Sequence, residues 1–390
     1  MKKQIINFMS RVDERKNSAQ IKLQLLIYGI QDAAELFSTH CIGFKEEHYA
    51  YDNGNWGVDK KRLVPTEILL PGGIVSKLHI RPDSPYKLAY DSGTLYIIKN
   101  ERYLSEAMFL KRPAFWKFKT RSGKDMKSIA QIYGLNALNF NIFSGCEFHN
   151  VGLGCKFCSV RSTVDSESMI AVHKEVEDLV DVCEYATKYD KPKYLIMTGG
   201  SYVNRESEWQ RNVAILRAIR EKLPWNNEIK GNVSFLPPKN IEVLKELFDL
   251  KVENPSFNIE VWPETNFRII CPGKSTFVGF HHIVKSLLYL RDIYGAGRVW
   301  SNFVAGIVSL KDIKDGFKFM ADNGIVPGAN IYHAEVGSFF GNSLGLIDEK
   351  YILELYHYAA ELYHQYGYKP YFDTCVLRNS IANEVYEGLL

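Results

Sequence analysis

The sequence predicts an α/β fold with parallel strands. From about residue 135, short apolar runs of strand length alternate with amphipathic segments of helical length, six times in a row. The 390 residues can bury a large core, and the content of 46% hydrophobic and 24% charged residues is typical of a globular chain. Successive strand–helix units run parallel through right-handed crossovers, so the pattern fits either a doubly wound sheet or a barrel.

Each predicted strand is followed by a predicted helix. The strands are expected at residues 137–143, 194–197, 231–235, 257–261, 299–305 and 329–333, and the helices at about residues 172–188, 206–222, 240–250, 281–294, 310–323 and 350–366. Asn240 is a suitable N-cap for the third of these helices, and Asn323 with Gly324 is a suitable stop for the fifth.

The first 130 residues follow a different pattern. Residues 20–37 have apolar side chains at helical spacing and predict an amphipathic helix. Short strand-like runs follow at residues 76–80, 86–89 and 94–98, and the last two flank Asp91, Ser92 and Gly93, as in a hairpin. We interpret residues 1–130 as a small α+β extension and residues 131–390 as the main α/β domain.

Charge and cysteine content narrow the functional classes. The net charge of +3, from 48 basic and 45 acidic residues, gives no overall electrostatic footprint for nucleic acid and favours a small-molecule substrate. The seven cysteines have no even spacing typical of a secreted disulfide scaffold. The first 20 residues lack the apolar segment of a signal peptide, and no window has the roughly 18 apolar residues of a membrane span. We therefore expect a cytoplasmic protein without a membrane partner.

The most informative stretch is residues 143–160, FSGCEFHNVGLGCKFCSV. It follows the first predicted strand and holds Cys146, Cys155 and Cys158, while glycines allow its backbone to wrap closely around a compact group. Three thiolates from one loop suit an iron–sulfur cluster, whose irons are held by cysteine sulfur. Three ligands for four irons leave one iron open. Two alternatives remain: a zinc site with His149 as fourth ligand, and metal-free thiols, which could be buried or act as nucleophiles.

This stretch resembles the radical S-adenosylmethionine (SAM) enzymes, in which three cysteines hold a 4Fe–4S cluster and SAM chelates the fourth iron. Those enzymes usually carry an aromatic residue before the third cysteine, and Phe157 stands there. Their commonest first gap is three residues, whereas this chain has eight between Cys146 and Cys155. The resemblance covers about residues 135–370 and implies a partial (β/α)6 TIM-type barrel, with its active face at the carboxyl ends of the strands.

The resemblance also assigns SAM-binding positions. Gly199 and Gly200, after the second predicted strand, match the family's glycines that contact the SAM amino group, although Ser201 replaces the usual acidic residue. Gly306, after the fifth strand, matches the backbone that faces adenine.

The fourth predicted strand reads Phe257-Asn258-Ile259-Glu260-Val261. Asn258 and Glu260 share a face by strand alternation, and a carboxylate there can accept both ribose hydroxyls. This resembles a strand of the biotin synthase and lipoyl synthase branch; the alternative is a buried carboxylate paired with a barrel cation. Arg268 is expected to pair with the SAM carboxylate or with Glu260.

Four further cysteines raise the question of a second cluster. Both of those synthases carry an auxiliary cluster as a sulfur source, so Cys41, Cys271 and Cys375 are candidates for one, with free thiols as the alternative. Cys183 lies on a predicted helix and is expected in the core.

The implied function is reductive cleavage of SAM, with hydrogen abstraction from a small molecule and sulfur insertion as an option. An electron donor such as flavodoxin or ferredoxin would be the partner. The rival interpretations are a zinc-stabilised binding module and a SAM-independent α/β enzyme with a cysteine nucleophile.

Overall fold

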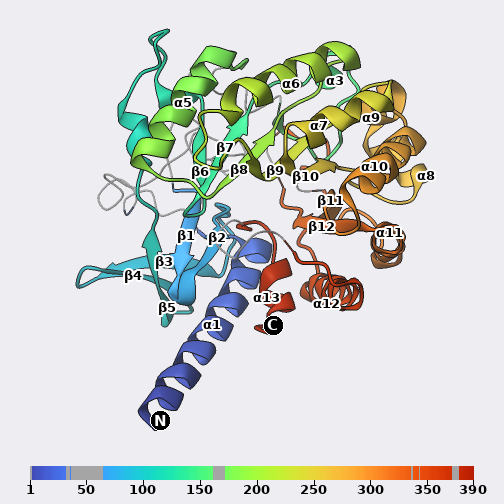
Figure 1. Cartoon of the computed structure of the whole chain (residues 1–390). Coiled ribbons are helices and arrows are strands. Elements are labelled where there is room, and N and C mark those ends of the chain that lie inside the picture. The colour runs from blue at the N-terminus through green and yellow to red at the C-terminus, as the bar shows by residue number, and fades with distance from the viewer. Residues whose placement is uncertain are drawn as a thin grey trace.

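The computed structural model describes residues 2–31, 36, 65–160, 172–334, 337–341, 343–370 and 377–390, with side chains from residue 13 onward. These residues form two sheets. A five-stranded sheet has the order β2-β1-β5-β4-β3, and a seven-stranded sheet has the order β12-β11-β10-β9-β8-β7-β6. Figure 1 shows the larger sheet with its helices in the upper part of the molecule, and the smaller sheet and helix α1 below it.

The seven-stranded sheet is the predicted partial barrel. Its strands are β6 (Gln131–Tyr133), β7 (Ala137–Asn141), β8 (Tyr194–Thr198), β9 (Ile229–Phe235), β10 (Val252–Phe257), β11 (Val299–Ala305) and β12 (Ile325–Ile331). Strands β7 to β12 pair in parallel in chain order, and β6 adds an antiparallel edge. One cavity touches both Asn139 on β7 and Asn330 on β12, at opposite sides of this row of six, so the sheet curls around it.

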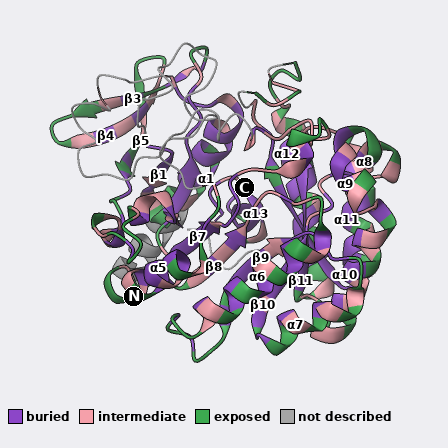
Figure 2. Ribbon diagram, turned by 90° about the horizontal axis from the view of Figure 1, so that it is seen from above, coloured by how far each residue is buried: buried purple, intermediate pink, exposed green. Residues whose placement is uncertain are grey.

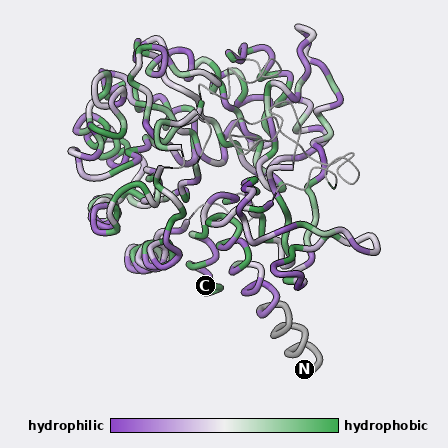
Figure 3. The backbone as a smooth tube through the Cα atoms, turned by 180° about the vertical axis from the view of Figure 1, so that it is seen from behind, coloured by the Kyte–Doolittle hydropathy of each residue, from purple (hydrophilic) through white to green (hydrophobic). Residues whose placement is uncertain are grey.

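Helices cover the outer face of this sheet (Figures 1 and 2). They are α5 (Val176–Tyr189), α6 (Arg205–Arg220), α7 (Lys245–Asp249), α8 (Glu264–Ile270), α9 (Pro272–Phe277), α10 (Phe280–Tyr294), α11 (Leu310–Asp322) and α12 (Glu349–Tyr366), with the short helices α3 (Glu147–Asn150) and α13 (Ala382–Tyr386) elsewhere. Figure 3 shows hydrophobic and hydrophilic residues alternating along these helices. One face of each long helix therefore packs on the sheet.

Helix α11 and strand β11 illustrate why these segments fold as they do. The buried residues of α11 include Ile313, Phe317 and Met320, spaced four and three residues apart on one face. Its N-cap, Ser309, accepts a hydrogen bond from the Asp312 N–H group. All seven residues of β11 are buried, as expected for a strand covered on both faces of a parallel sheet.

Most predicted barrel elements are confirmed within a few residues, and one strand is displaced. Strand β10 ends at Phe257, whereas the sequence predicted a strand at residues 257–261. Residues 252–257 include Asn254 and Pro255, which suggested a turn, so the apolar run after them was preferred. Helices α8 and α9 were not predicted. The third predicted helix starts with the 3-10 turn η4 (Ile241–Leu244), and Asn240 caps it as expected by accepting from the Glu242 N–H group.

The smaller sheet contains β1 (Glu67–Leu70), β2 (Ile74–Lys77), β3 (Tyr86–Asp91), β4 (Thr94–Lys99) and β5 (Arg102–Phe109). The predicted hairpin is confirmed: Asp91 pairs with Thr94, and Ser92 and Gly93 have φ of 49° and 88°, as a two-residue primed turn requires. Strands β1 and β5 were not predicted.

Helix α1 (Lys2–Tyr28) differs from the predicted helix at both ends. It begins well before residue 20, because the polar segment ahead of the apolar pattern is also helical. It ends at Tyr28, before Gly29, whose φ of 66° breaks the helix. Of the expected continuation, residues 32–35 and 37 lie outside the described part of the chain.

Helix α1 packs between two apolar clusters. Leu23, Leu26 and Ile27 belong to the core of the barrel, whereas Ile21 and Leu25 belong to the core under the smaller sheet. Because one helix serves both cores, the division of the chain at residue 130 stays a prediction.

A buried ion pair fixes α1 to the last described segment. Lys22 Nζ lies 2.8 Å from Glu384 Oε1 of α13, and both side chains are fully buried. The Lys22 ammonium also donates to the Leu377 carbonyl at 2.5 Å. These contacts join residues more than 350 positions apart in the sequence. In the part of the chain that the structure describes, no helix is long and apolar enough to cross a bilayer.

Candidate active site

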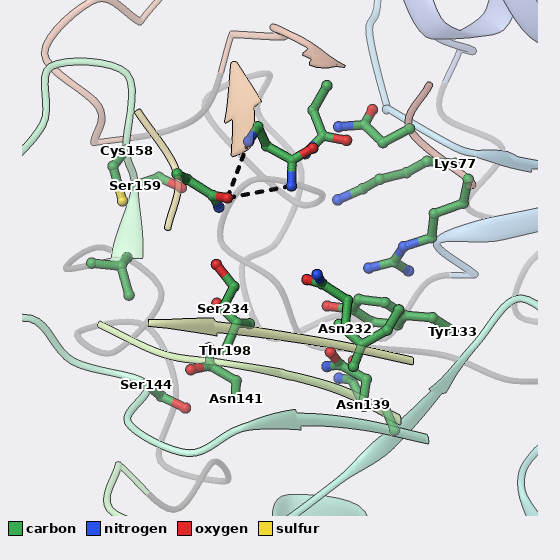
Figure 4. A pocket seen from close by; sticks show the side chains of 18 of the residues that line it. Lys77, Tyr133, Asn139, Asn141, Ser144, Cys158, Ser159, Thr198, Asn232 and Ser234 are labelled. Carbon is green, nitrogen blue, oxygen red and sulfur yellow. Dashed lines mark hydrogen bonds between the residues drawn. The ribbon is translucent and has the colours of Figure 1, made fainter. Parts of the chain in front are cut away.

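The curled sheet encloses a cavity of about 450 Å³. Side chains from the inner face of the strands line it: Asn141 of β7, Thr198 of β8, Ser234 of β9, Val304 of β11 and Asn330 of β12, with Asn258 just beyond the end of β10. Because strand residues two apart point to the same side, each strand presents a short column of side chains to this space. Figure 4 shows these mostly polar groups converging on the cavity, which we call the lumen.

The cysteine loop follows β7 and opens onto the lumen. Phe157 and Cys158 line the cavity (Figure 4 labels Cys158). Three backbone hydrogen bonds fix the loop. The Glu147 N–H donates to Ser201 O at 2.9 Å and the Lys156 N–H to Ile270 O at 2.9 Å, while the Gly273 N–H donates to Leu153 O at 2.8 Å. The loop is therefore held between the end of β8 and the junction of α8 and α9.

The predicted glycine pair lies directly beside this loop. A Cβ atom on Gly200 would stand 1.6 Å from the Gly145 carbonyl oxygen and 3.0 Å from Cys146 Cα. The Gly200 N–H donates to Phe143 O at 2.8 Å. A Cβ atom on Gly199 would lie 3.1 Å from Phe143 N. The pair thus lets the end of β8 meet the cysteine loop backbone to backbone, and its contact with a SAM amino group stays a prediction.

The three loop thiols have distinct surroundings. Burial raises the pKa of Cys146, while the backbone N–H groups of Ser201, Phe148 and His149 act in the opposite direction by donating to its sulfur. A hydrogen bond with the Cys271 thiol, and then burial, raises the pKa of Cys155 well above its ordinary value. Cys146 and Cys155 are close enough to interact electrostatically.

These residues fit an iron–sulfur cluster in donor chemistry. The loop offers only sulfur ligands, which iron–sulfur clusters use, and backbone N–H groups already point at one of them, as is typical around cluster sulfurs. Within the described residues, no group of three or more His, Cys, Asp or Glu side chains is arranged to hold a metal ion, so the loop does not form a closed tetrahedral zinc site with His149.

Glu260 lies beyond β10 and faces the lumen together with Asn258, as the alternation predicted. Its backbone continues alongside β11: the Glu260 N–H donates to Asn302 O at 2.9 Å, and the Val304 N–H donates to Glu260 O at 2.8 Å. Its carboxylate pairs with Lys274, with Nζ 2.6 Å from Oε1. This is the alternative anticipated for Glu260, a buried carboxylate paired with a barrel cation. Arg268 does not make this pair; it is exposed on α8.

Lys274 was not identified from the sequence. It lies on α9, and its Nζ donates to both Glu260 and the Asn258 carbonyl. Burial lowers its pKa, but the attraction of Glu260 and of the Cys155 and Cys271 thiols outweighs burial and raises it. The cysteine loop and the predicted ribose site thus share one buried cation. Its position in the segment Cys271-Pro272-Gly273-Lys274 was the available signal.

Gly306 follows β11 with a φ of 98°, and a Cβ atom there would stand 2.4 Å from the Ile347 side chain. Its N–H donates to the Tyr351 hydroxyl at 3.3 Å. Local backbone geometry and packing therefore already require glycine, and contact with adenine stays a prediction.

The remaining cysteines separate into three cases. Cys183 is buried in α5, which confirms its place in the core. Cys271 is buried beside Cys155, so it belongs to the surroundings of the loop. Cys41 and Cys375 lie outside the described residues, as does Glu335, which follows the lumen residue His333.

Lys174 is a buried lumen residue whose charge should make stability depend on pH. Its Nζ donates to Ser144 Oγ at 2.7 Å, and burial, with Arg211 and Lys124 nearby, lowers its pKa from 10.5 to about 7. Between about pH 7 and 10.5 the unfolded lysine keeps a proton that the folded one releases, so the free energy of unfolding should rise with pH in that window. From pH 6.5 to 9.5 we expect wild type to gain about 3 kcal/mol relative to Lys174→Met.

Urea unfolding of both proteins at the two pH values measures this gain. Lys311→Met is the matched control, because that side chain is 82% exposed on α11, and it should show no such gain relative to wild type. An equal difference between wild type and Lys174→Met at both pH values would contradict the prediction.

Comparison with known proteins gives distant relatives. No family model matches the chain. The bacteriochlorophyllide c C-7(1)-hydroxylase of Chlorobaculum limnaeum is 23% identical over 239 residues, which are 57% of this chain and 60% of the relative. The match therefore spans less than two thirds of the relative's length.

Two solved structures are similar to this chain. Methylornithine synthase (PylB) has a TM-score of 0.46 at 13% identity, covering 69% of this chain and 79% of that protein. Coproporphyrinogen III oxidase (HemN) from Escherichia coli, described as a radical SAM enzyme, has a TM-score of 0.40 at 15% identity, covering 65% of this chain and 58% of that protein.

Proposed function

We propose that this chain, an enzyme of the radical SAM superfamily, cleaves SAM reductively and abstracts a hydrogen atom from a small molecule held in the lumen. The observation that carries the proposal is the position of the three-cysteine loop. It follows the first parallel strand, and Phe157 and Cys158 face a polar cavity lined by six parallel strands. In barrel enzymes the carboxyl ends of the strands form the active face.

In this proposal Cys146, Cys155 and Cys158 hold a 4Fe–4S cluster, which supplies the electron for breaking the sulfonium bond of SAM. The backbone N–H groups near Cys146 favour its thiolate form, and the surrounding barrel keeps water from the reaction. Raised pKa values at Cys146 and Cys155 argue against a metal-free cysteine nucleophile, which needs a thiolate.

The SAM contacts are proposed on the same face. Gly199 and Gly200 would offer backbone groups to the amino group of SAM, and Gly306 would face adenine. Glu260 would accept the ribose hydroxyls, with Lys274 holding its carboxylate in place. Arg268 would have to turn inward from its exposed position on α8 to meet the SAM carboxylate.

The substrate is proposed as a small molecule, since the lumen volume of about 450 Å³ is in the range of small-ligand sites. We favour hydrogen abstraction without sulfur insertion, because Cys271 lies beside the loop and not in a separate group. An electron donor such as flavodoxin or ferredoxin would supply the reducing equivalent.

Anaerobic reconstitution with iron and sulfide tests the proposal. We expect about four irons and four sulfides per chain, and formation of 5′-deoxyadenosine from SAM in the presence of dithionite, measured by liquid chromatography. About eight irons would reopen the two-cluster alternative. An iron-free protein with stoichiometric zinc, or a loaded protein that forms no 5′-deoxyadenosine, would overturn the proposal.

A further inference from the structure

The lumen has two chemically different ends. Figure 4 shows Cys158 and Ser159 toward one end and Lys77 and Tyr133 toward the other. The second end is built by segments outside the parallel strands: Lys77 comes from β2, Tyr133 from β6, and Arg378 from the segment before α13. The Lys77 N–H donates to the Arg378 carbonyl at 2.8 Å, so the two cationic residues are fixed side by side.

These cations are buried. Lys77 is 5% exposed and Arg378 is 8% exposed. Arg378 Nη1 lies 2.5 Å from the buried Glu67 carboxylate, and its guanidinium carbon stands 3.6 Å from the centre of the Tyr133 ring. Two cations and one carboxylate leave an excess of one positive charge among these three residues. A buried cationic end of this kind attracts a singly charged anion, because the low local dielectric strengthens the interaction.

The whole lining has the same sign. Among the described lining residues, Lys77, Lys127, Lys174 and Arg378 are basic, whereas Glu260 is the one carboxylate and is paired with Lys274. His79, which stacks on the lumen residue His333 with ring centroids 3.5 Å apart, senses this environment. Burial lowers its pKa well below the ordinary value, and His333, Lys77 and Arg378 act in the same direction.

The middle of the lumen requires hydrogen-bond donors. Asn139 and Asn141 of β7 both line the cavity, and their buried Oδ1 atoms have no hydrogen-bond partner among the described residues. Asn139 is only 2% exposed. Buried amide oxygens are normally satisfied, so two of them on the wall of a cavity indicate a ligand with N–H or O–H groups. Residues two apart on a strand place these acceptors about 7 Å from each other.

Resting on the proposed function, we propose that the substrate is a small carboxylate that also carries amide or hydroxyl donors. Its carboxylate binds at Lys77 and Arg378, its donors meet Asn139 and Asn141, and the carbon that loses hydrogen lies at the opposite end, near Cys158. The excess of one positive charge at the anchor matches a carboxylate better than a phosphate monoester, which carries nearly two negative charges at neutral pH. Reaction is thus directed to a position remote from the carboxylate.

Binding to the reconstituted protein tests this assignment without turnover. The probes are N-acetylated dipeptides and sugar acids, each supplied as the carboxylate and as the primary carboxamide, with sugar phosphates as a third group. Saturation-transfer NMR and titration give the affinities. We expect the best carboxylates to bind at least tenfold more tightly than their carboxamides, and more tightly than the phosphates.

Two variants locate the site. Lys77→Met should bring carboxylate affinity down to that of the carboxamide, and the nearly isosteric Asn139→Asp should weaken carboxylates at least tenfold by placing a negative charge in the lumen. Lys311→Met, on the outer surface of α11, should leave all affinities unchanged. Arg378 stays unaltered because it compensates buried Glu67.

Equal affinities for acids and amides, no binding by any acid, preference for phosphates, or full carboxylate affinity in both folded variants would each overturn the assignment. Formation of 5′-deoxyadenosine by the same preparation is scored separately. If 5′-deoxyadenosine forms but the carboxylate preference is absent, the substrate assignment fails alone; the reverse result removes the radical reaction and leaves the anion site.

Discussion

Replacing Cys155 with alanine is expected to lower 5′-deoxyadenosine formation by more than about 100-fold, because substitutions that only support a metal ligand already cost 10–100-fold. The reconstituted variant should hold little iron and lose the brown colour of a cluster. Cys146→Ala and Cys158→Ala should behave alike, since the three ligands act as one set. Iron and sulfide content, the visible spectrum and the rate of SAM cleavage measure the effect.

Two other cysteines are the controls. Cys183→Ala removes a thiol from the core of α5 and should keep full iron content. Cys271→Ala removes the thiol that hydrogen-bonds to Cys155 and should also keep its cluster. The ligand assignment is wrong if Cys155→Ala retains four irons, or if Cys271→Ala loses the cluster while Cys155→Ala does not.

Gly200→Ala is expected to reduce iron loading at least tenfold while the barrel stays folded. The added methyl group would stand 1.6 Å from the Gly145 carbonyl oxygen and 3.0 Å from Cys146 Cα, and both are backbone atoms that cannot rotate away. The end of β8 and the cysteine loop must therefore separate, at a cost of about 1–3 kcal/mol if the change resembles other overpacked sites. Iron content and thermal unfolding before and after reconstitution measure both effects.

Gly123→Ala provides the comparison. This glycine has a φ of 88° and nothing within 4 Å of the added atom, so alanine there introduces backbone strain without a clash. It should be destabilised by about 1 kcal/mol and should bind iron like wild type. Wild-type iron content in Gly200→Ala would show that the close approach of the two segments is not needed for cluster binding.

Repeating patterns made the barrel predictable. The alternation of strand and helix signals located all six parallel strands to within a few residues except β10, where Asn254 and Pro255 resemble a turn although their strand is fully inserted in the sheet. Local composition misleads there because neighbouring strands β9 and β11 determine the conformation. The limits of α1 were missed for a related reason: its first half has no apolar pattern, and its end depends on a single glycine.

The candidate site was predictable where neighbours in sequence are also neighbours in space. The three cysteines share one loop, and Asn258 and Glu260 share one face, so both groups could be recognised directly. Lys274, Lys77 and Arg378 come from α9, β2 and the segment before α13, and only the folded chain brings them to the lumen. The inward asparagines were the overlooked signal, since polar residues at alternate positions of otherwise apolar strands indicate a polar interior.

The buried pair of Lys22 and Glu384, with the adjacent contact of β2 with Arg378, has a consequence for biogenesis. A growing polypeptide emerges from the ribosome with its amino-terminal part first, so the partners of Lys22 and Lys77 are made hundreds of codons later. Contacts between such distant positions close slowly and late. The anionic ligand's chamber should therefore be the last region to mature, and a nascent chain should expose it until synthesis is complete.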